Sequence, residues 1–394
     1  MDPVRNPYTP GAGARPFELV GREGLLGAYD VALERAQIRM AVQSKILYGL
    51  RGVGKTVLLQ EFVSRARRHK WLVIELEALA GEPLVPALTR ELFRELRNAG
   101  RTWSGDALQW VRRVFKAFSI RADPGTGSYS FEVDIEPARG YADSGDLDRD
   151  LHEMLAELAG LAGHHGVGLL LAVDELQEVE RATLSALNAT VHRLGQGEEP
   201  APFLFAGAGL PSLRRILPEA TSYAERLYEY WHVDRLDDAA IRDALTGPAA
   251  AQGVGWEPRA LDAAVRFSGG YPYFVQVLGR RAWDVAVGPV ITGADLRDAM
   301  ADARQDLDAG LYAARWQRAT RAEQRFMRAM AGLAEDGPVR MSDLVEALGK
   351  SRPSQLSPIR AQLISKGLVY APDRGEVAFT VPGMGDFAAR QVVD

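Results

Sequence analysis

One glycine-rich segment constrains the fold of this chain more than any other feature. Residues 49–56 read Gly-Leu-Arg-Gly-Val-Gly-Lys-Thr, between Lys-Ile-Leu-Tyr at 45–48 and an apolar run that begins at Val57. The pattern G-x-x-x-x-G-K-[S/T] binds phosphate when it joins a strand to a helix, and this is the predicted context. A chance match in a chain of this length is expected in about one case in a hundred. A glycine turn before an ordinary core helix is therefore the weaker interpretation.

The residues of this segment have separate predicted roles in binding a nucleotide with Mg²⁺. Glycines let backbone N–H groups surround a phosphate at the start of a helix. Lys55 is expected to neutralise the β and γ phosphates, and the Thr56 hydroxyl to complete the Mg²⁺ shell. Arg51 fits a solvated surface arginine better than a phosphate ligand. The predicted phosphate-binding residues are Gly49, Gly52, Val53, Gly54, Lys55, Thr56 and Val57.

A second motif supplies the acids that phosphate chemistry needs. The apolar run at 168–173 is typical of a central parallel strand, and it ends in Asp174 and Glu175. Asp174 is expected to hold Mg²⁺ through water, and Glu175 to polarise the attacking water. Further strands at 71–76 and 203–207 predict a doubly wound α/β sheet with its ligand site at the strand ends. An acid pair that merely caps a helix is the alternative.

Composition and charge limit the remaining classes of function. The chain of 394 residues has no cysteine, so disulfides, thiolate metal sites and cysteine nucleophiles are excluded. No run reaches the roughly 18 apolar residues of a membrane span, and residues 1–16 predict an extended arm with no signal peptide. A cytoplasmic protein that does not contact a membrane is expected. The net charge of -5 argues against general coating of nucleic acid.

The C-terminal part has the element order of a winged helix-turn-helix. Helices are expected at 321–332, 341–348 and 357–366, followed by a hairpin over 368–379. Residues 350–374 contain five Lys or Arg and one Asp, although residues 321–394 as a whole carry a net charge of only +1. The third helix is expected to enter the major groove of double-stranded DNA. A module that docks on its own core or on a protein is the alternative. The predicted DNA contacts are Arg352, Gln355, Arg360 and Arg374.

Together these motifs resemble the AAA+ ATPases, in the branch shared by origin-recognition initiators and STAND signalling ATPases. The resemblance rests on Phe-Glu-Leu-Val-Gly-Arg-Glu at 17–23, the 49–56 loop, the 168–175 strand, Gly-Tyr-Pro at 270–272 and the C-terminal order. It implies an arm at 1–16, a P-loop core at 17–232 with an insertion at about 82–150, a helical lid at 233–308 and a winged-helix domain at 309–394. In the insertion, helices are expected at 84–98 and 105–118, a strand at 129–136, and a helix capped by Asp146.

The resemblance also implies further site residues. Val20, Gly21 and Arg22 are expected on the adenine side, and Pro272 fits either a lid contact with the nucleotide or a plain helix start. Arg226 fits either a catalytic arginine finger or a surface arginine paired with a glutamate. Arg280 and Arg281 are secondary candidates for a nucleotide sensor. The strand at 203–207 ends without the polar sensor residue of the family, so slow hydrolysis is expected.

The predicted function is an ATPase that converts ATP and water to ADP and phosphate and couples its nucleotide state to a DNA-binding winged helix. The alternative is a STAND-like signalling ATPase whose C-terminal module binds a protein partner and which forms homo-oligomers with ATP. A metabolic kinase is disfavoured, because the resemblance leaves no segment for a small-substrate site.

Overall fold

A five-stranded parallel sheet forms the N-terminal half of the molecule. The computed structural model describes residues 1–11, 13–99, 146–196, 199–334 and 337–392. The strands are β1 (Ser44–Tyr48), β2 (Leu72–Glu77), β3 (Leu169–Asp174), β4 (Phe203–Gly209) and β5 (Tyr228–His232), in the spatial order β2-β3-β4-β1-β5. The four predicted strands are confirmed, whereas β5 was not predicted. The α/β class follows from this order, and β3 is an interior strand, between β2 and β4.

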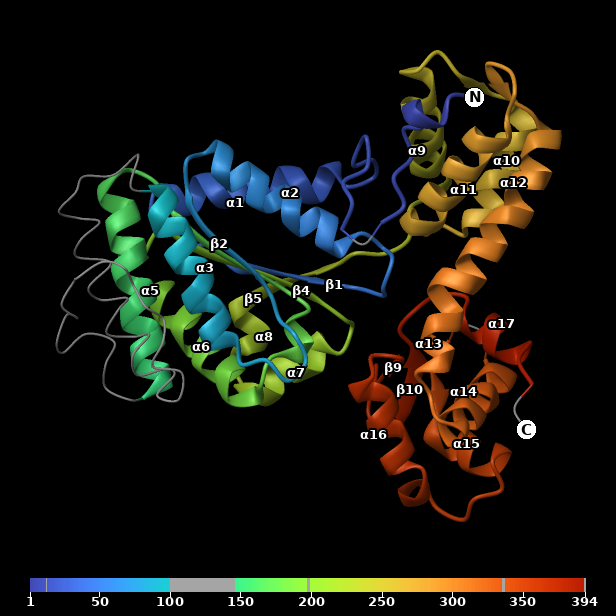
Figure 1. Cartoon of the computed structure of the whole chain (residues 1–394). Coiled ribbons are helices and arrows are strands. Elements are labelled where there is room, and N and C mark those ends of the chain that lie inside the picture. Colours follow the sequence, from blue (N-terminus) through green and yellow to red (C-terminus); the bar gives the residue numbers. More distant parts are fainter. Residues whose placement is uncertain (12, 100–145, 197–198, 335–336, 393–394) are drawn as a thin grey trace.

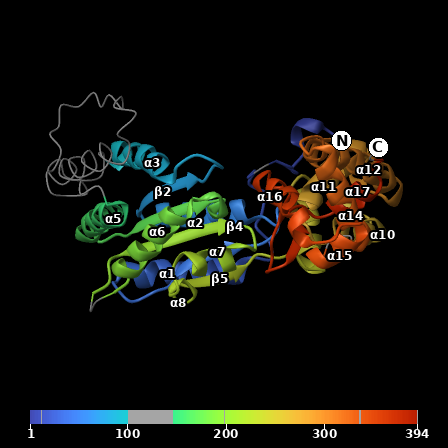
Figure 2. The same ribbon diagram turned by 90° about the horizontal axis from the view of Figure 1, so that it is seen from below.

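Helices cover both faces of the sheet, as the doubly wound class requires (Figures 1 and 2). One apolar core joins α1 (Glu23–Gln37) and α2 (Lys55–Arg68) to one face. A second core covers the other face. Its helices are α3 (Leu84–Ala99), α5 (Leu147–His164), α6 (Arg181–Leu194), α7 (Leu213–Ala220) and α8 (Ala224–Leu227). Along β3, Leu170 and Ala172 enter the first core and Leu171 and Val173 the second. This explains the uninterrupted apolar run.

The expected insertion is described in part. The helix predicted at 84–98 is confirmed as α3, and Asp146 caps α5 by accepting a hydrogen bond from the Asp148 N–H. The helix expected at 105–118 and the strand expected at 129–136 lie outside the described residues.

Four helices follow the sheet and pack on one another: α9 (Asp238–Ala250), α10 (Pro258–Ser268), α11 (Pro272–Val285) and α12 (Gly293–Asp306). Two short parallel strands, β6 (Gly255–Trp256) and β7 (Val290–Ile291), tie this group together. Helix α12 continues through a π-helical segment, η3 (Leu307–Ala313), into α13 (Ala314–Gln317). The domain boundary expected at 308/309 therefore falls inside a continuous helical path, which Figure 1 shows running down the right side of the molecule.

The C-terminal module, residues 309–394, is described to residue 392. Its helices are α14 (Arg321–Leu333), α15 (Met341–Ala347), α16 (Ser357–Ser365) and α17 (Met384–Ala389), with the short helix η4 (Pro353–Gln355) before α16. The strands β8 (Val339–Arg340), β10 (Glu376–Phe379) and β9 (Val369–Tyr370) form an antiparallel sheet in that order. The module shares one apolar core with α9–α12.

The N-terminal arm is docked along the α9–α12 group. After the short helix η1 (Pro3–Arg5), the Tyr8 hydroxyl donates to the Leu245 carbonyl, and its ring lies where a side chain at Gly279 would stand. The Thr9 N–H donates to Gln276 Oε1 at 3.0 Å. Farther along, Arg15 pairs with the buried Glu61 of α2 at 2.9 Å. The arm thus joins α9–α12 to the sheet domain. Within the described ranges, no helix has the length and apolar character of a membrane span.

Candidate nucleotide site

The loop between β1 and α2 owes its shape to its glycines. Gly52 and Gly54 have φ angles of 85° and 92°, in the left-handed region that favours glycine. At Gly49, a Cβ atom would lie 2.2 Å from the Val233 carbonyl oxygen, so a side chain has no room there. Helix α2 begins directly after Gly54, and its first N–H groups face the loop. The predicted strand, loop and helix context is confirmed.

Lys55 is buried at the first position of α2. Its ammonium group donates to the Leu50 carbonyl oxygen at 2.8 Å, within the same loop. Burial lowers the pKa of Lys55 to about 8, against the opposite influence of Glu175 and Asp174. A buried ammonium is costly until an anion pairs with it. The loop therefore holds a cation suited to a phosphate.

Asp174 and Thr56 meet at the end of β3. The Thr56 side chain donates to the Asp174 carboxylate, which also accepts the Glu175 N–H at 2.8 Å. Burial raises the pKa of Asp174. One carboxylate beside one hydroxyl fits Mg²⁺, which takes few protein ligands and completes its shell with water and phosphate oxygens. In the described ranges no cluster of three or more His, Asp or Glu residues forms a closed metal cage. The predicted metal pair is therefore brought together.

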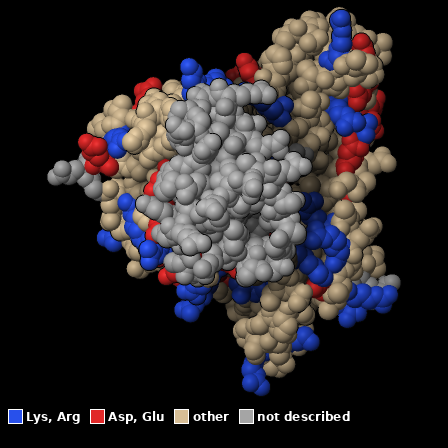
Figure 3. Space-filling view, turned by 60° about the vertical axis from the view of Figure 1, so that its left-hand side comes forward, with Lys and Arg blue, Asp and Glu red and all other residues tan. Residues whose placement is uncertain are grey.

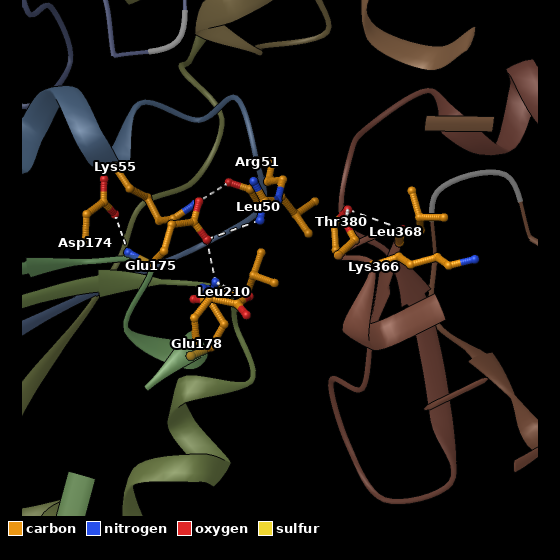
Figure 4. Close-up of polar contacts among 12 residues, drawn as sticks. Leu50, Arg51, Lys55, Asp174, Glu175, Glu178, Leu210, Lys366, Leu368 and Thr380 are labelled. Atoms are coloured by element: carbon orange, nitrogen blue, oxygen red, sulfur yellow. Dashed lines mark hydrogen bonds and ion pairs between the residues drawn. The ribbon is translucent and has the colours of Figure 1, made fainter. Parts of the chain in front are cut away.

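Glu175 faces the phosphate-binding loop and is held by two side chains (Figure 4). Its Oε2 atom is 3.2 Å from a guanidinium nitrogen of Arg51 and accepts a second hydrogen bond from Gln177 Nε2. Its φ of 48° is unusual for a residue with a side chain. Arg51, expected to be solvated, is instead the ion-pair partner of the predicted water-activating base.

Gln177 places a polar group at the end of β4 that was not predicted from the sequence. Its Oε1 atom accepts the Leu210 N–H at 3.0 Å, just beyond that strand. A Cβ atom on Gly209 would lie 2.3 Å from the same oxygen, so the glycine leaves room for the amide. No polar residue lies within β4, but the Gln177 amide, from the short helix η2 (Leu176–Glu178) that follows β3, stands beside the end of β4. The signal was the Asp-Glu-Leu-Gln run at 174–177.

A cavity of about 440 Å³ opens over the loop. Of the predicted nucleotide contacts, Val20, Arg22, Gly52, Val53, Gly54, Lys55, Thr56, Val57 and Pro272 line it. Gly21 and Gly49 do not line it. Gly21 instead allows a backbone conformation that favours glycine, with a φ of 69°. The wall also includes Arg51, Glu175, residues of α9 and α11, part of the N-terminal arm, and Leu311, Arg315, Val381 and Pro382. That the arm and the C-terminal module border this cavity was not predicted from the sequence.

Arg22 connects parts of the cavity wall. One guanidinium nitrogen donates to the Val53 carbonyl at 3.3 Å and to the Asp234 carbonyl at 2.5 Å. Burial lowers the pKa of Arg22, and the nearby Asp234 opposes this shift. Arg22 therefore ties the phosphate-binding loop to the segment that enters α9.

The C-terminal module contacts the phosphate-binding loop directly. The Arg51 N–H donates to the Thr380 carbonyl oxygen at 3.0 Å, a contact that Figure 4 places beside the Arg51–Glu175 pair. Leu50 and Leu210 pack with Tyr370 and Ala378 of the module's sheet. From α11, the Tyr273 N–H donates to the Gly52 carbonyl at 3.3 Å. The loop thus contacts both the α9–α12 group and the C-terminal module.

Arg226 lies away from this cavity. It immediately precedes β5, so it stands at the amino-terminal end of the parallel strands, whereas the loop follows the carboxyl end of β1. There it lines a second cavity, of about 720 Å³, with His192, Tyr223 and the ion pair Lys45–Glu229. Arg226 therefore does not meet the loop of its own chain.

The four predicted DNA contacts have different surroundings. Arg352, Gln355 and Arg374 are exposed, and Gln355 Oε1 accepts the Ser351 N–H at 2.9 Å. Arg360 is half-buried, and it donates to the Glu376 carbonyl of β10 at 3.0 Å. Lys366 pairs with the buried Glu323 at 2.6 Å. The local excess of positive charge is therefore only partly presented to solvent.

Comparisons with known proteins agree with this geometry. Residues 18–205 match the family model of the AAA ATPase domain, and residues 309–388 match a domain of unknown function. No curated protein sequence matches the chain. A Walker-type ATPase of Pyrococcus abyssi is similar in structure, with 17% identity, 95% of this chain and 97% of that chain covered, and a TM-score of 0.59.

Two further structures are more distant. Cdc6p of Pyrobaculum aerophilum has 17% identity over 99% of this chain and 96% of its own, with a TM-score of 0.49. The RuvB Holliday junction branch migration motor of Thermotoga maritima has 16% identity over 93% and 96%, with a TM-score of 0.44. Residues 18–205 thus match the AAA ATPase domain model, and the chain shares its fold with the Pyrococcus ATPase.

Proposed function

We propose that this protein is a Mg-ATP-binding and hydrolysing switch that couples its nucleotide state to the C-terminal module. The observation that carries the proposal is the cavity, whose walls include the phosphate-binding loop, the start of α11 and residues of the module. A nucleotide bound there would contact all three. Differential contact with ATP and ADP is what a switch requires. The proposed units are a core at 17–232, a lid at 233–308 and a module at 309–394.

Each site residue has a proposed part in hydrolysis. The Lys55 ammonium would bind the β and γ phosphates, and Thr56 and Asp174 would hold Mg²⁺, which supplies positive charge to the transferred phosphoryl group. Glu175 would orient and deprotonate the attacking water. Its carboxylate must first break the ion pair with Arg51 and the hydrogen bond from Gln177. This supports slow turnover.

We further propose that the C-terminal module is a winged helix that binds double-stranded DNA. The helices α14, α15 and α16 and the sheet β8-β10-β9 have the order expected of that motif, with Arg374 in the turn between β9 and β10. In Figure 3 the lower part of the molecule, where these elements lie, carries many Lys and Arg side chains and few acidic ones. Arg352, Gln355 and Arg374 are the exposed candidates. Arg360 would support β10 instead.

The test of DNA binding is the paired variant Arg352→Ala with Arg374→Ala. Loss of two phosphate contacts should weaken duplex binding about uniformly across sequences and reduce the salt slope by about 2. Binding of a labelled duplex is measured from low to moderate salt with ATP present. The matched control removes two exposed arginines of the α9–α12 group, Arg259 and Arg297. If the parent binds no duplex at low salt, or if both pairs lose affinity equally, the DNA proposal fails.

The alternative, a STAND-like ATPase that assembles with ATP, is favoured by the position of Arg226. Because this residue stands at the end of the sheet opposite its own loop, it can reach a phosphate only in a neighbouring copy. On this reading the module would bind a protein partner instead of DNA.

Arg226→Ala tests that alternative. An arginine that acts between copies should give roughly a hundredfold loss of turnover when it is removed. ATPase rates are compared at high and low protein concentration, with mass measured in solution. The parent and the variant should differ only where the parent is assembled. Equal rates at every concentration would remove the arginine from catalysis.

A further inference from the structure

Two arginines from distant parts of the chain share the nucleotide cavity. Arg51 belongs to the phosphate-binding loop, and Arg315 belongs to α13, the helical connection between α12 and the C-terminal module. Both line the cavity together with Glu175. The cavity wall therefore contains two guanidinium groups, one of which is paired with a carboxylate.

The hydrogen bonds of Arg51 are incomplete. One terminal nitrogen is 3.2 Å from Glu175 Oε2, but the Nε atom is buried without a hydrogen-bond partner among the described residues. A buried donor that lacks an acceptor is unfavourable, because it has lost water and gained nothing in return. An oxygen-rich anion in the cavity would supply the missing acceptor.

Arg315 has no carboxylate partner within the described part of the chain. Its guanidinium donates to the Leu311 carbonyl one turn earlier at 2.8 Å. Burial lowers the pKa of Arg315, and the nearby cations Arg51 and Arg318 lower it further. A half-buried cation beside like charges is the environment of an anion-binding residue.

The two arginines that were expected to sense the nucleotide pair with carboxylates outside the cavity. Arg281 makes a bidentate pair with Asp306, and Arg280 faces Asp284 with 3.9 Å between the charged atoms. Neither lines the cavity. Arg315 stands beyond both in the sequence, next to the π-helical segment, and it does line the cavity.

We propose that Arg315 and Arg51 together bind the terminal phosphate of ATP. This inference rests on the proposed function. Planar guanidinium groups suit a phosphate because they present paired donors to its oxygens. Binding would draw Arg51 away from Glu175 and leave that carboxylate free to face water. It would also fix the helix that leads into the C-terminal module, so ATP and ADP would hold the module differently.

The experiment measures ATP and ADP affinity separately, with fluorescent analogues of both and Mg²⁺ present. Arg315→Gln removes the charge but keeps a donor for the Leu311 carbonyl, and Arg315→Ala removes both. ATP affinity should fall about tenfold or more in each variant, while ADP affinity changes less than about threefold. The control is Arg297→Ala, an exposed arginine of α12, which should match the parent for both nucleotides.

A double-mutant cycle with Arg51→Ala adds a second readout. If both guanidinium groups contact one phosphate, their losses of ATP affinity should not add. Equal loss of ATP and ADP affinity in both Arg315 variants, or no loss of either, would overturn the inference. Failure of the proposed function is a different result, since the parent would then bind neither nucleotide.

Discussion

Replacing Lys55 with alanine is expected to weaken Mg-ATP binding by at least about a hundredfold. Within the described part of the chain, the buried ammonium donates one hydrogen bond, to the Leu50 carbonyl, so two of its three donors are available to the β and γ phosphates. Charge-assisted hydrogen bonds of this kind are worth about 1.5–3 kcal/mol each, and about 1.4 kcal/mol corresponds to tenfold in affinity. Titration with a fluorescent ATP analogue gives the change directly.

Two controls separate this effect from damage to the fold. Lys350→Ala removes an exposed lysine of the C-terminal module and should leave nucleotide affinity unchanged. The Lys55→Ala protein should unfold at a temperature no lower than the parent in the absence of nucleotide, because the variant no longer buries a charge. If Lys55→Ala binds Mg-ATP within about threefold of the parent, the loop is not the phosphate site.

Glu175→Gln is expected to keep Mg-ATP bound and to reduce hydrolysis by about 10²–10⁴-fold. Glutamine preserves the size of the side chain and a hydrogen-bonding oxygen, but it cannot take a proton from water. It also breaks the ion pair with Arg51, which leaves that cation free for the nucleotide. Binding is measured at equilibrium, and turnover by release of phosphate.

The matched control for this variant is Glu178→Gln, three residues along the same turn. Glu178 Oε1 accepts a hydrogen bond from Gln177 Nε2 at 3.4 Å and does not line the nucleotide cavity. This variant should hydrolyse ATP at nearly the parental rate. If Glu175→Gln hydrolyses ATP like the parent, another group activates the water and the assignment of the base is wrong.

The phosphate-binding loop and β3 could be predicted because their signals are local. Gly52 and Gly54 permit the positive φ angles that the loop needs, a requirement set within a few residues. The apolar run before Asp174 indicates a strand buried on both faces. The strand β5 was missed although Tyr228 and Trp231 are buried in opposite cores. Its Tyr-Glu-Tyr-Trp-His sequence is short and mixes polar with apolar residues. Within the described part of the chain it pairs with β1 alone, a distant partner that no local pattern indicates.

The contributions of Arg51, Gln177 and Arg315 depend on long-range packing. Arg51 meets Glu175 across 124 positions of sequence, and Arg315 reaches the cavity only because α12 continues through η3 into α13. The docking of the arm on α11 is similarly non-local, since Tyr8 fits against Gly279. No periodicity or turn signal near these residues indicates which distant residues they contact.

The continuous helical path from Gly293 to Gln317 has a mechanical consequence. At about 1.5 Å per residue it extends roughly 37 Å, so a 10° tilt at one end displaces the other by about 6 Å. The π-helical segment in its middle, Leu307–Ala313, holds one turn wound more loosely than the rest. Rewinding that turn would rotate α13 and everything beyond it relative to α12. A change in that turn would therefore move the C-terminal module, and it would begin at residues that line the candidate nucleotide cavity.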